Sequence, residues 1–241
     1  MQTNWLERAE LLVKEEGTRK LAKAHVLILG MGGVGSFAAE FIARAGVGTL
    51  TIIDGDDVDV TNINRQLPAL HSTVGTSKVK LMGERIKDIN PQVQLNVVEE
   101  FVEPERAKEL LETYEPHYVV DCIDSLKPKI HMMVACKKAG IPIVSSMGAG
   151  GKVLPEKIKV SDISKTHNCK LAFVVRKRLR KHHGIKKGIK AVYSSELPAS
   201  DSMKTVEGVD YKKSFYGTIS FIPAAFGLHA AATVVNDLLA D

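Results

Sequence analysis

The sequence predicts a doubly wound α/β fold with a mostly parallel sheet, an N-terminal helix and a mixed C-terminal extension. Short runs rich in β-branched residues and leucine alternate with longer stretches of helical periodicity, and low-complexity linkers and internal repeats are absent. A glycine-rich turn separates the first such run from the helix that follows it. With 241 residues and 44% hydrophobic content, the chain can bury one substantial core. We therefore expect a single domain over residues 1–241.

The elements follow in order along the chain. Five buried or half-buried runs predict strands at residues 25–29, 49–53, 93–98, 118–123 and 141–145. Helical spacing predicts a first helix at residues 5–23 and a second helix directly after the glycine turn. Further helices are predicted at 75–90, 105–114, 128–140 and 170–182. Beyond residue 151 the pattern becomes mixed, with extended segments expected at 152–160 and 191–195. The apolar tract 217–240 carries Pro223, His229, Asn236 and Asp237, which favours a buried or subunit-interface helix over a membrane span.

The glycine turn at residues 30–35 has the spacing G-x-G-x-x-G between a strand and a helix. In this Rossmann-like arrangement Gly30 permits the tight turn, Gly32 allows phosphate to approach the backbone, and Gly35 allows close helix packing. Asp54 ends the second strand, at the sequence separation from the glycine turn where a carboxylate that binds a ribose hydroxyl is expected. A glycine-rich turn of any α/β protein is the alternative, but this context favours a nucleotide-binding core over residues 20–150.

Charged residues follow the predicted strand ends, where ligands gather in open α/β sheets. Arg65 can donate two parallel hydrogen bonds to a phosphate. Lys78, at a predicted helix start, supplies a positive point charge for the same phosphates. Asp124 could hold Mg²⁺ between phosphates, or could instead cap the helix that follows it. For Arg65 and Lys78 the alternative is surface solvation. Asp121, inside the fourth strand, is expected to orient nearby groups, and Cys122 is expected to be a core residue.

The formal net charge of +5 is unevenly distributed. A run without acidic residues lies between positions 176 and 190, and such a block attracts phosphates. The candidate nucleic-acid contacts are Arg176, Lys177, Arg178, Arg180 and Lys181. A solvated helix face is the alternative.

Cysteine usage and the N-terminus bear on location and metal content. Three scattered cysteines are too few for a disulfide framework and lack the Cys-x-x-Cys pairs of a structural zinc site, so we expect no zinc. No charged-then-apolar segment opens the chain. A reduced, cytoplasmic location without stable membrane insertion is therefore expected.

Several motifs together resemble the adenylate-forming superfamily of ubiquitin-activating enzymes and sulfur-carrier activators. They are Gly30 to Ser36, Asp54-Gly55-Asp56, Asn62-Ile63-Asn64-Arg65-Gln66, Gly75-x-x-Lys78 and Asp121-Cys122-Ile123-Asp124. The resemblance implies ATP-dependent activation of a carboxylate, with Arg65, Lys78 and Asp124 as the catalytic residues. It places ATP on Gly30, Gly32, Gly33, Gly35, Asp54, Asp56, Asn64, Arg65, Lys78, Asp124 and Ser125, with Asp124 on Mg²⁺. A homodimer is also implied, in which an arginine acts across the subunits, with Arg8 as a candidate.

The second half resembles the tRNA threonylcarbamoyladenosine dehydratase branch of that superfamily. The matching motifs are Gly148 to Gly151, Val160 to Thr166, Val175 to Arg180, Tyr193 to Glu196 and Gly217 to Pro223. One departure is Asn168-Cys169 where an Asp-Pro pair is expected, which puts the start of the next helix in doubt. This branch implies ATP-dependent cyclisation of threonylcarbamoyladenosine in tRNA, with residues 151–241 contacting the tRNA anticodon arm and the second subunit. A monovalent cation and a sulfur-transfer partner are left open.

Other functions fit part of the same pattern. An adenylating enzyme for a ubiquitin-like sulfur-carrier protein would share the fold, and a nicotinamide-dependent oxidoreductase would share the glycine turn and Asp54. Hydride transfer has no need of Arg65, Lys78 and Asp124, which argues against the oxidoreductase. A nucleotide-binding protein without catalysis is disfavoured by the full set of phosphate ligands.

Overall fold

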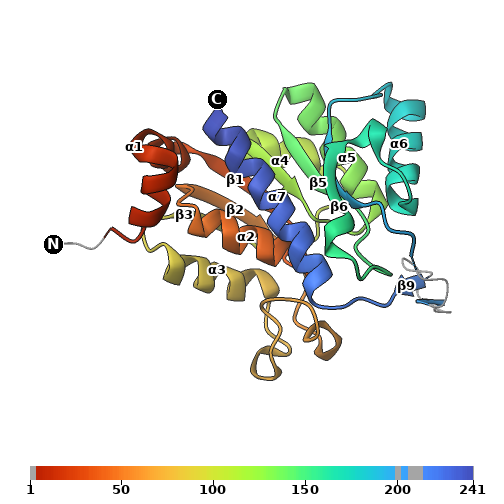
Figure 1. The fold of residues 1–241 in the computed structure, drawn as a ribbon, viewed down its shortest axis with the longest axis horizontal. Coiled ribbons are helices and arrows are strands. Elements are labelled where there is room, and N and C mark those ends of the chain that lie inside the picture. The colour runs from red at the N-terminus through yellow and green to blue at the C-terminus, as the bar shows by residue number, and fades with distance from the viewer. Residues whose placement is uncertain (1–3, 199–201, 206–213, 241) are drawn as a thin grey trace.

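The structure is a computed structural model that describes residues 4–198, 202–205 and 214–240 (Figure 1). Its centre is a seven-stranded sheet in the order β3-β2-β1-β4-β5-β7-β6. The strands are β1 (His25–Leu29), β2 (Thr49–Ile53), β3 (Gln94–Val98), β4 (Tyr118–Asp121), β5 (Ile143–Ser146), β6 (Ile158–Asp162) and β7 (Lys190–Ser194). All neighbouring strands are parallel except β6, which runs antiparallel to β7 at the edge. The predicted doubly wound sheet is confirmed.

Helices cover both faces of the sheet (Figure 1). One hydrophobic cluster lies under α1 (Glu7–Lys23), α2 (Gly35–Arg44), α3 (Lys78–Ile89) and α7 (Phe221–Ala240). The other lies under α4 (Arg106–Tyr114), α5 (Leu126–Ala139) and α6 (Lys170–His183). Two short antiparallel strands, β8 (Met203–Thr205) and β9 (Ser214–Tyr216), precede α7. Turns of 3-10 helix lie at Val60–Asn62, His71–Thr73, Pro155–Lys157 and Ile163–Lys165. Residues 199–201, 206–213 and 241 of the predicted C-terminal extension lie outside the described residues.

Several predicted boundaries were wrong by a few residues, and the backbone gives the reasons. The helix expected from residue 75 begins at Lys78, because Gly75 has a φ of +83° that does not fit a helix. The strand expected to reach residue 123 ends at Asp121, whose Oδ1 accepts the Ile123 N–H at 3.1 Å and turns the chain. In α1, Lys14 has a φ of 65° and interrupts the predicted continuous helix.

Three further segments differ in extent. The predicted strand at 141–145 begins at Ile143, and the helix predicted at 128–140 begins at Leu126. Within the extended segment expected at 152–160 the strand starts only at Ile158, after a 3-10 turn that begins at Pro155.

The start of α6, which the sequence left in doubt, lies at Lys170 as predicted. Asn168 has a φ of 54° and donates a hydrogen bond from Nδ2 to the Ser195 carbonyl at 2.8 Å. An asparagine tolerates this left-handed conformation better than most residues. Asn168 thus turns the chain into the helix without the expected Asp-Pro pair.

The apolar helix α7 is long and apolar enough to cross a membrane by length and composition alone. In the fold it packs against α2 and the sheet, and it buries Ile222, Phe226, Ala230 and Val234. A Cβ at Gly227 would lie 2.5 Å from the Val34 carbonyl oxygen, so the two helices meet at backbone distance. This contact places the start of α7 beside the glycine turn and accounts for its apolar composition.

Helices α2 and α3 are joined by Glu40, a buried carboxylate that receives hydrogen bonds from Arg85 at 2.6 Å and Arg44 at 2.7 Å. Burial alone would raise the pKa of Glu40, but the two guanidinium groups hold it below its usual 4.5. This link matters for function because α2 follows the glycine turn and α3 begins at Lys78.

We expect Glu40→Gln to lower the free energy of unfolding by about 1 kcal/mol near neutral pH, since both arginines are partly solvated. Because the folded-state pKa is depressed, this stabilisation is present above the unfolded pKa and is lost as the pH falls through the folded value. Urea unfolding at about pH 7 and about pH 3 measures it. An unchanged difference at both pH values would contradict the assignment, and Glu84→Gln, exposed on α3, is the control.

Candidate functional site

The glycine turn lies where the strand order reverses, which is where open α/β sheets bind their ligands. β1 pairs with β2 on one side and β4 on the other, and Leu29 is the register partner of Asp121. Gly30 has a φ of +86°, and a Cβ at Gly35 would clash with the Gly30 carbonyl oxygen. The turn therefore requires glycine at both positions, and it leaves backbone N–H groups at the start of α2 facing the ligand edge.

Asp54 lies at the end of β2 and is linked to the turn. Its Oδ2 accepts the Met31 N–H at 2.5 Å, and its Oδ1 accepts the Asp56 N–H at 2.8 Å. Burial raises the pKa of Asp54, against the effect of these hydrogen bonds and of Lys78. Each carboxylate oxygen can accept a second hydrogen bond, so the position suits the ribose contact that the sequence predicts.

Lys78 is the first residue of α3, and its side chain is buried to 6% exposure. Its Nζ lies 2.9 Å from Asp56 Oδ2, and its backbone N–H donates to the Asp56 carbonyl at 3.1 Å. The ion pair brings together two predicted site residues. It holds the Lys78 ammonium at a helix N-terminus, where an anion is stabilised further.

The loop after β2 carries Asn64 and Arg65. Asp59 caps the 3-10 turn Val60–Asn62 and fixes the loop. Arg65 donates from Nη1 to the Thr61 carbonyl and to Asn64 Oδ1, both at 2.8 Å, while Asn64 donates from Nδ2 to the Thr218 carbonyl at 2.9 Å. These bonds tie the loop to the segment before α7 and leave other guanidinium N–H groups of Arg65 available for an anion.

Gln66 and Pro223 lie close to the glycine turn. A Cβ at Gly33 would lie 3.0 Å from Pro223 and 3.2 Å from the Arg65 carbonyl oxygen, so the turn, the loop and α7 converge there. The Gln66 Nε2 atom lies 3.8 Å from the Cβ position at Gly32. Its Oε1 atom is buried and lacks a hydrogen-bond partner among the described residues. This orphaned acceptor would suit a hydrogen-bond donor of a bound nucleotide, such as a ribose hydroxyl, because ionised phosphate oxygens do not donate.

Asp124 and Ser125 follow β4. Ser125, not Asp124, is the N-cap of α5, so the capping role considered for Asp124 is wrong. Asp124 is exposed, and Ser125 Oγ donates to its Oδ1 at 3.5 Å. A hard cation between phosphates needs only one or two protein carboxylates, which is what this position offers. Within the described residues, no cluster of three or more His, Cys, Asp or Glu residues could hold a metal.

Beneath this loop lies a fully buried ion pair, of which the sequence indicated Asp121 but not Lys129. Lys129 Nζ contacts Asp121 Oδ2 at 2.7 Å, Ser145 Oγ at 3.1 Å and the Ser146 carbonyl at 3.0 Å. Asp121 and Lys129 are both 0% exposed at the side chain. Because Asp121 also accepts the Ile123 N–H, the predicted orienting role of Asp121 is confirmed, and Lys129 is its partner.

Cys122 lies beside the turn, and burial raises the pKa of its thiol to about 12. A thiol with such a pKa is protonated at neutral pH and is a poor nucleophile. This agrees with the predicted core role of Cys122. Cys122 is half-buried, whereas Cys169, the N-cap of α6, is buried.

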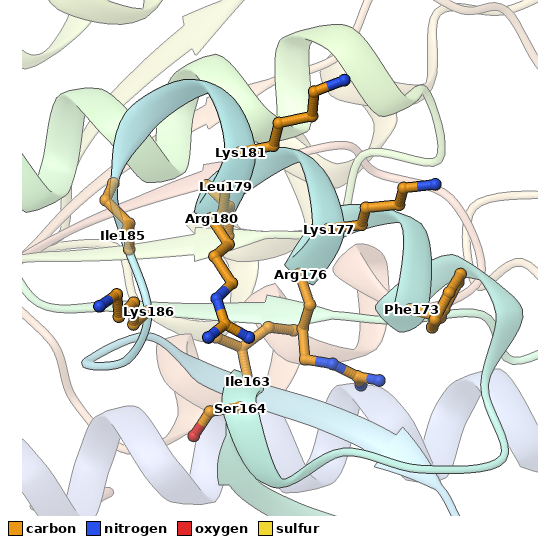
Figure 2. A pocket seen from close by; sticks show the side chains of 10 residues that line it. All are labelled: Ile163, Ser164, Phe173, Arg176, Lys177, Leu179, Arg180, Lys181, Ile185 and Lys186. Atoms are coloured by element: carbon orange, nitrogen blue, oxygen red, sulfur yellow. The ribbon is translucent and has the colours of Figure 1, made fainter.

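The predicted nucleic-acid residues lie on α6, and all of them except Arg178 are shown in Figure 2. Lys177, Arg178, Arg180 and Lys181 are exposed. Arg176 differs, because it is partly buried and donates from Nη1 to the Thr166 carbonyl at 2.7 Å and to Thr166 Oγ1. Arg176 thus has a structural role that the sequence did not indicate. Arg8 lies on α1, next to Leu6, which packs on Gly46 at the opposite edge of the sheet from the glycine turn. Within one chain it stands apart from the nucleotide site.

A sequence model of the ThiF family matches residues 6–240. The chain belongs to the ThiF family. The tRNA threonylcarbamoyladenosine dehydratase of Bacillus subtilis is 45% identical to this chain, and the alignment covers 97% of this chain and 94% of the relative. The Escherichia coli tRNA threonylcarbamoyladenosine dehydratase is 39% identical, covering 95% of the chain and 91% of the relative. A crystal structure of the E. coli enzyme in complex with ATP has a TM-score of 0.89 and 35% identity, covering 99% of this chain and 96% of that chain.

Two residues of the candidate site were not singled out from the sequence. Gln66 stood inside the motif 62–66, so its position in that motif was the available signal. Lys129 carried no such signal, because a lysine on a helix is usually solvated. Only the pairing of β4 with β5 places Asp121 and Ser145 around it.

Proposed function

We propose that the chain catalyses the ATP-dependent dehydration of threonylcarbamoyladenosine in tRNA to its cyclic form. The observation that carries this proposal is the glycine turn joined by Asp54 to the Asp56–Lys78 pair, in a chain that matches named dehydratases along nearly its whole length. The same arrangement supports binding of a nucleoside triphosphate as co-substrate.

Each site residue has a role in this reaction. The turn of Gly30, Gly32, Gly33 and Gly35 would hold the phosphates, and Asp54 the ribose. Asn64, Arg65 and Lys78 would neutralise the charge that shifts when a phosphoanhydride breaks, with Gln66 donating or accepting beside them. Asp56 keeps the Lys78 ammonium in place. Asp124 would hold Mg²⁺, which would help to neutralise the phosphate charge, and Ser125 would contact the nucleotide.

The chemistry needs positioning more than a protein nucleophile. The threonyl carboxylate oxygen attacks a phosphorus of ATP, the phosphoanhydride bond breaks and pyrophosphate or ADP leaves, and the resulting mixed anhydride has a good leaving group. The carbamoyl oxygen then attacks the activated carboxyl carbon and closes a five-membered ring. The former carboxylate oxygen leaves with the phosphate and the carbamoyl nitrogen releases its proton, so the nucleoside loses the elements of one water. Because both groups belong to one nucleoside, the closure is intramolecular. The protonated thiol of Cys122 agrees with a reaction that uses no covalent protein intermediate.

The proposal also includes the oligomeric state and the cellular location of the chain. The chain acts in the cytoplasm as a homodimer in which Arg8 reaches the neighbouring site, and exposed apolar residues of α1, Leu11 and Leu12, support contact with a second copy. The basic face of α6 receives the anticodon arm of the tRNA. A monovalent cation and a sulfur-transfer partner are compatible with this scheme but have no residues assigned to them.

The test uses the purified protein, ATP, magnesium and tRNA that carries the threonylcarbamoyl group. After incubation the tRNA is digested and its nucleosides are weighed by mass spectrometry. We expect the modified adenosine to lose the mass of one water only when ATP is present. An unchanged nucleoside in an assay where a known dehydratase succeeds would reject the proposal.

The role of α6 gives a separate prediction. The variant Lys177→Gln/Arg178→Gln/Arg180→Gln/Lys181→Gln is expected to bind tRNA more weakly, and the slope of log affinity against log salt should fall by about 0.7 to 0.9 for each phosphate that the variant no longer neutralises. Arg176 is kept because Thr166 holds it. The control is Lys23→Gln/Lys108→Gln, on α1 and α4, with exposed lysines. An unchanged slope in the α6 variant would remove this surface from the tRNA interface.

A further inference from the structure

A groove of about 660 Å³ runs beside α6 (Figure 2). We call it the α6 groove, and its lining residues are Ile163, Ser164, Phe173, Arg176, Lys177, Leu179, Arg180, Lys181, Ile185 and Lys186. Half of these are cationic and none is acidic. Figure 2 shows Arg180 directed toward Ile163 and Ser164 and the Arg176 guanidinium lying on the Phe173 side of Ile163, while Lys177 and Lys181 extend away from both. The groove therefore combines an apolar floor with a strong positive charge.

Phe173 is the unusual member of this lining. Its side chain is 57% exposed, although it is a large aromatic residue in a highly charged surrounding. The Arg176 guanidinium carbon lies 5.9 Å from the centre of its ring. Because Arg176 is anchored to Thr166, its guanidinium is fixed beside the ring. Phe173 thus presents a ring of defined position, flanked by cations, to a ligand outside the protein.

An exposed aromatic ring beside a row of cationic side chains is a combination by which proteins bind single-stranded RNA. Bases that are not paired stack on aromatic side chains, while Lys and Arg hold the phosphates between them. A paired helix would offer phosphates but would keep the faces of its bases covered. An acidic peptide would answer the charge of the groove but would leave Phe173 without a stacking partner.

The place of Phe173 in the fold strengthens this argument. Leu171, two residues earlier on α6, lies 3.9 Å from the Cβ position of Gly148, in the loop after β5. That loop lies at the edge where the parallel strands end, which is also the edge of the glycine turn. The Phe173 end of the α6 groove therefore lies on the side of the sheet that carries the nucleotide site.

We infer that the α6 groove binds a single-stranded segment of RNA, with one base stacked on the Phe173 ring and the neighbouring phosphates on Lys177, Arg180 and Lys186. This inference rests on the proposed function, in which the anticodon arm is the substrate, and it assigns to Phe173 a contact with a base. The stacking energy is distinct from the charge attraction because only the latter depends strongly on salt.

Two variants separate these contributions. We expect Phe173→Ala to weaken binding of a single-stranded oligoribonucleotide by about ten-fold, with the salt slope unchanged. Phe173→Tyr keeps the ring and should bind like the parent chain. Lys177→Gln should instead lower the salt slope. Equal affinity of the Phe173→Ala variant and the parent chain would overturn the inference.

A fluorescence measurement tests stacking directly. The chain has a single tryptophan, Trp5, so the variant Trp5→Phe/Phe173→Trp reports from the groove alone. An oligoribonucleotide should quench this fluorescence, while an abasic oligomer with the same number of phosphates should bind more weakly and quench little. Equal binding of the two oligomers would show that the groove holds the backbone only, and would overturn the stacking contact.

The outcome is separable from that of the proposed function. If the parent chain dehydrates threonylcarbamoyl tRNA while Phe173→Ala binds RNA normally, the inference about Phe173 fails and the function stands. If RNA quenches the tryptophan at position 173 while the nucleoside mass never changes, the groove contact stands and the proposed reaction fails.

Discussion

Replacing Lys78 by methionine should lower the rate of ATP-dependent turnover at least 100-fold while the protein remains folded. Lys78 is buried at the start of α3 and is held by Asp56, so its charge is already in place when the phosphates shift their charge. Removal of one such preorganised donor typically costs about 100- to 1,000-fold in rate. Methionine keeps an unbranched apolar stem that is one atom shorter, and it leaves Asp56, which is half exposed, in contact with water.

The matched control for Lys78 lies one half-turn further along the same helix. Lys80 is exposed and pairs with Glu99 at 2.6 Å, so Lys80→Met removes a positive charge of α3 without touching the turn. We expect near-normal turnover for Lys80→Met. Equal rates for the two variants would show that the Lys78 charge has no part in the reaction, and a diminished circular dichroism signal would assign its effect to folding instead.

The largest effect on stability is expected at Lys129. Lys129→Met leaves the Asp121 carboxylate buried without its cation, which typically costs about 3 to 5 kcal/mol of unfolding free energy. Because Asp121 also holds the Ile123 N–H, the loop carrying Asp124 should loosen and ATP affinity should fall as well. Denaturant unfolding gives the first quantity, and calorimetric titration with ATP gives the second.

A double variant distinguishes a broken ion pair from a packing defect. Asp121→Asn removes the uncompensated charge, so Asp121→Asn/Lys129→Met should be more stable than Lys129→Met alone. If the double variant is less stable than the single one, the stranded carboxylate is not the cause. Lys127→Met, exposed on the same helix, should leave stability nearly unchanged.

The strands were the most predictable part of this fold. β1 and β2 match the expected residues, because strands buried on both faces form continuous apolar runs with clear ends. Boundaries failed where one residue departs from its neighbours, as at Gly75 with its positive φ and at Lys14 inside α1. These backbone angles depend on tertiary contacts that a local pattern does not contain.

The site was predictable to the extent that its residues belong to local motifs. The turn, Asp54 and Lys78 are each recognisable from their neighbours in sequence, and the structure brings them together. The partners of Arg176 and Lys129 were not predictable, because Thr166 and Asp121 approach them only through the order of strands and helices. Whether each of these two cationic side chains is exposed or is held by a partner depends on the tertiary fold and not on its neighbours in the sequence.

The central claim, that a carboxylate is activated on a phosphate of ATP, is tested by following one oxygen atom. Threonylcarbamoyl tRNA labelled with ¹⁸O in its carboxylate is incubated with the protein and ATP, and the phosphorus-containing products are analysed by mass spectrometry. Our account predicts that one labelled oxygen appears in the nucleotide or phosphate released for each ring closed. Ring closure with the label found only in water would contradict it.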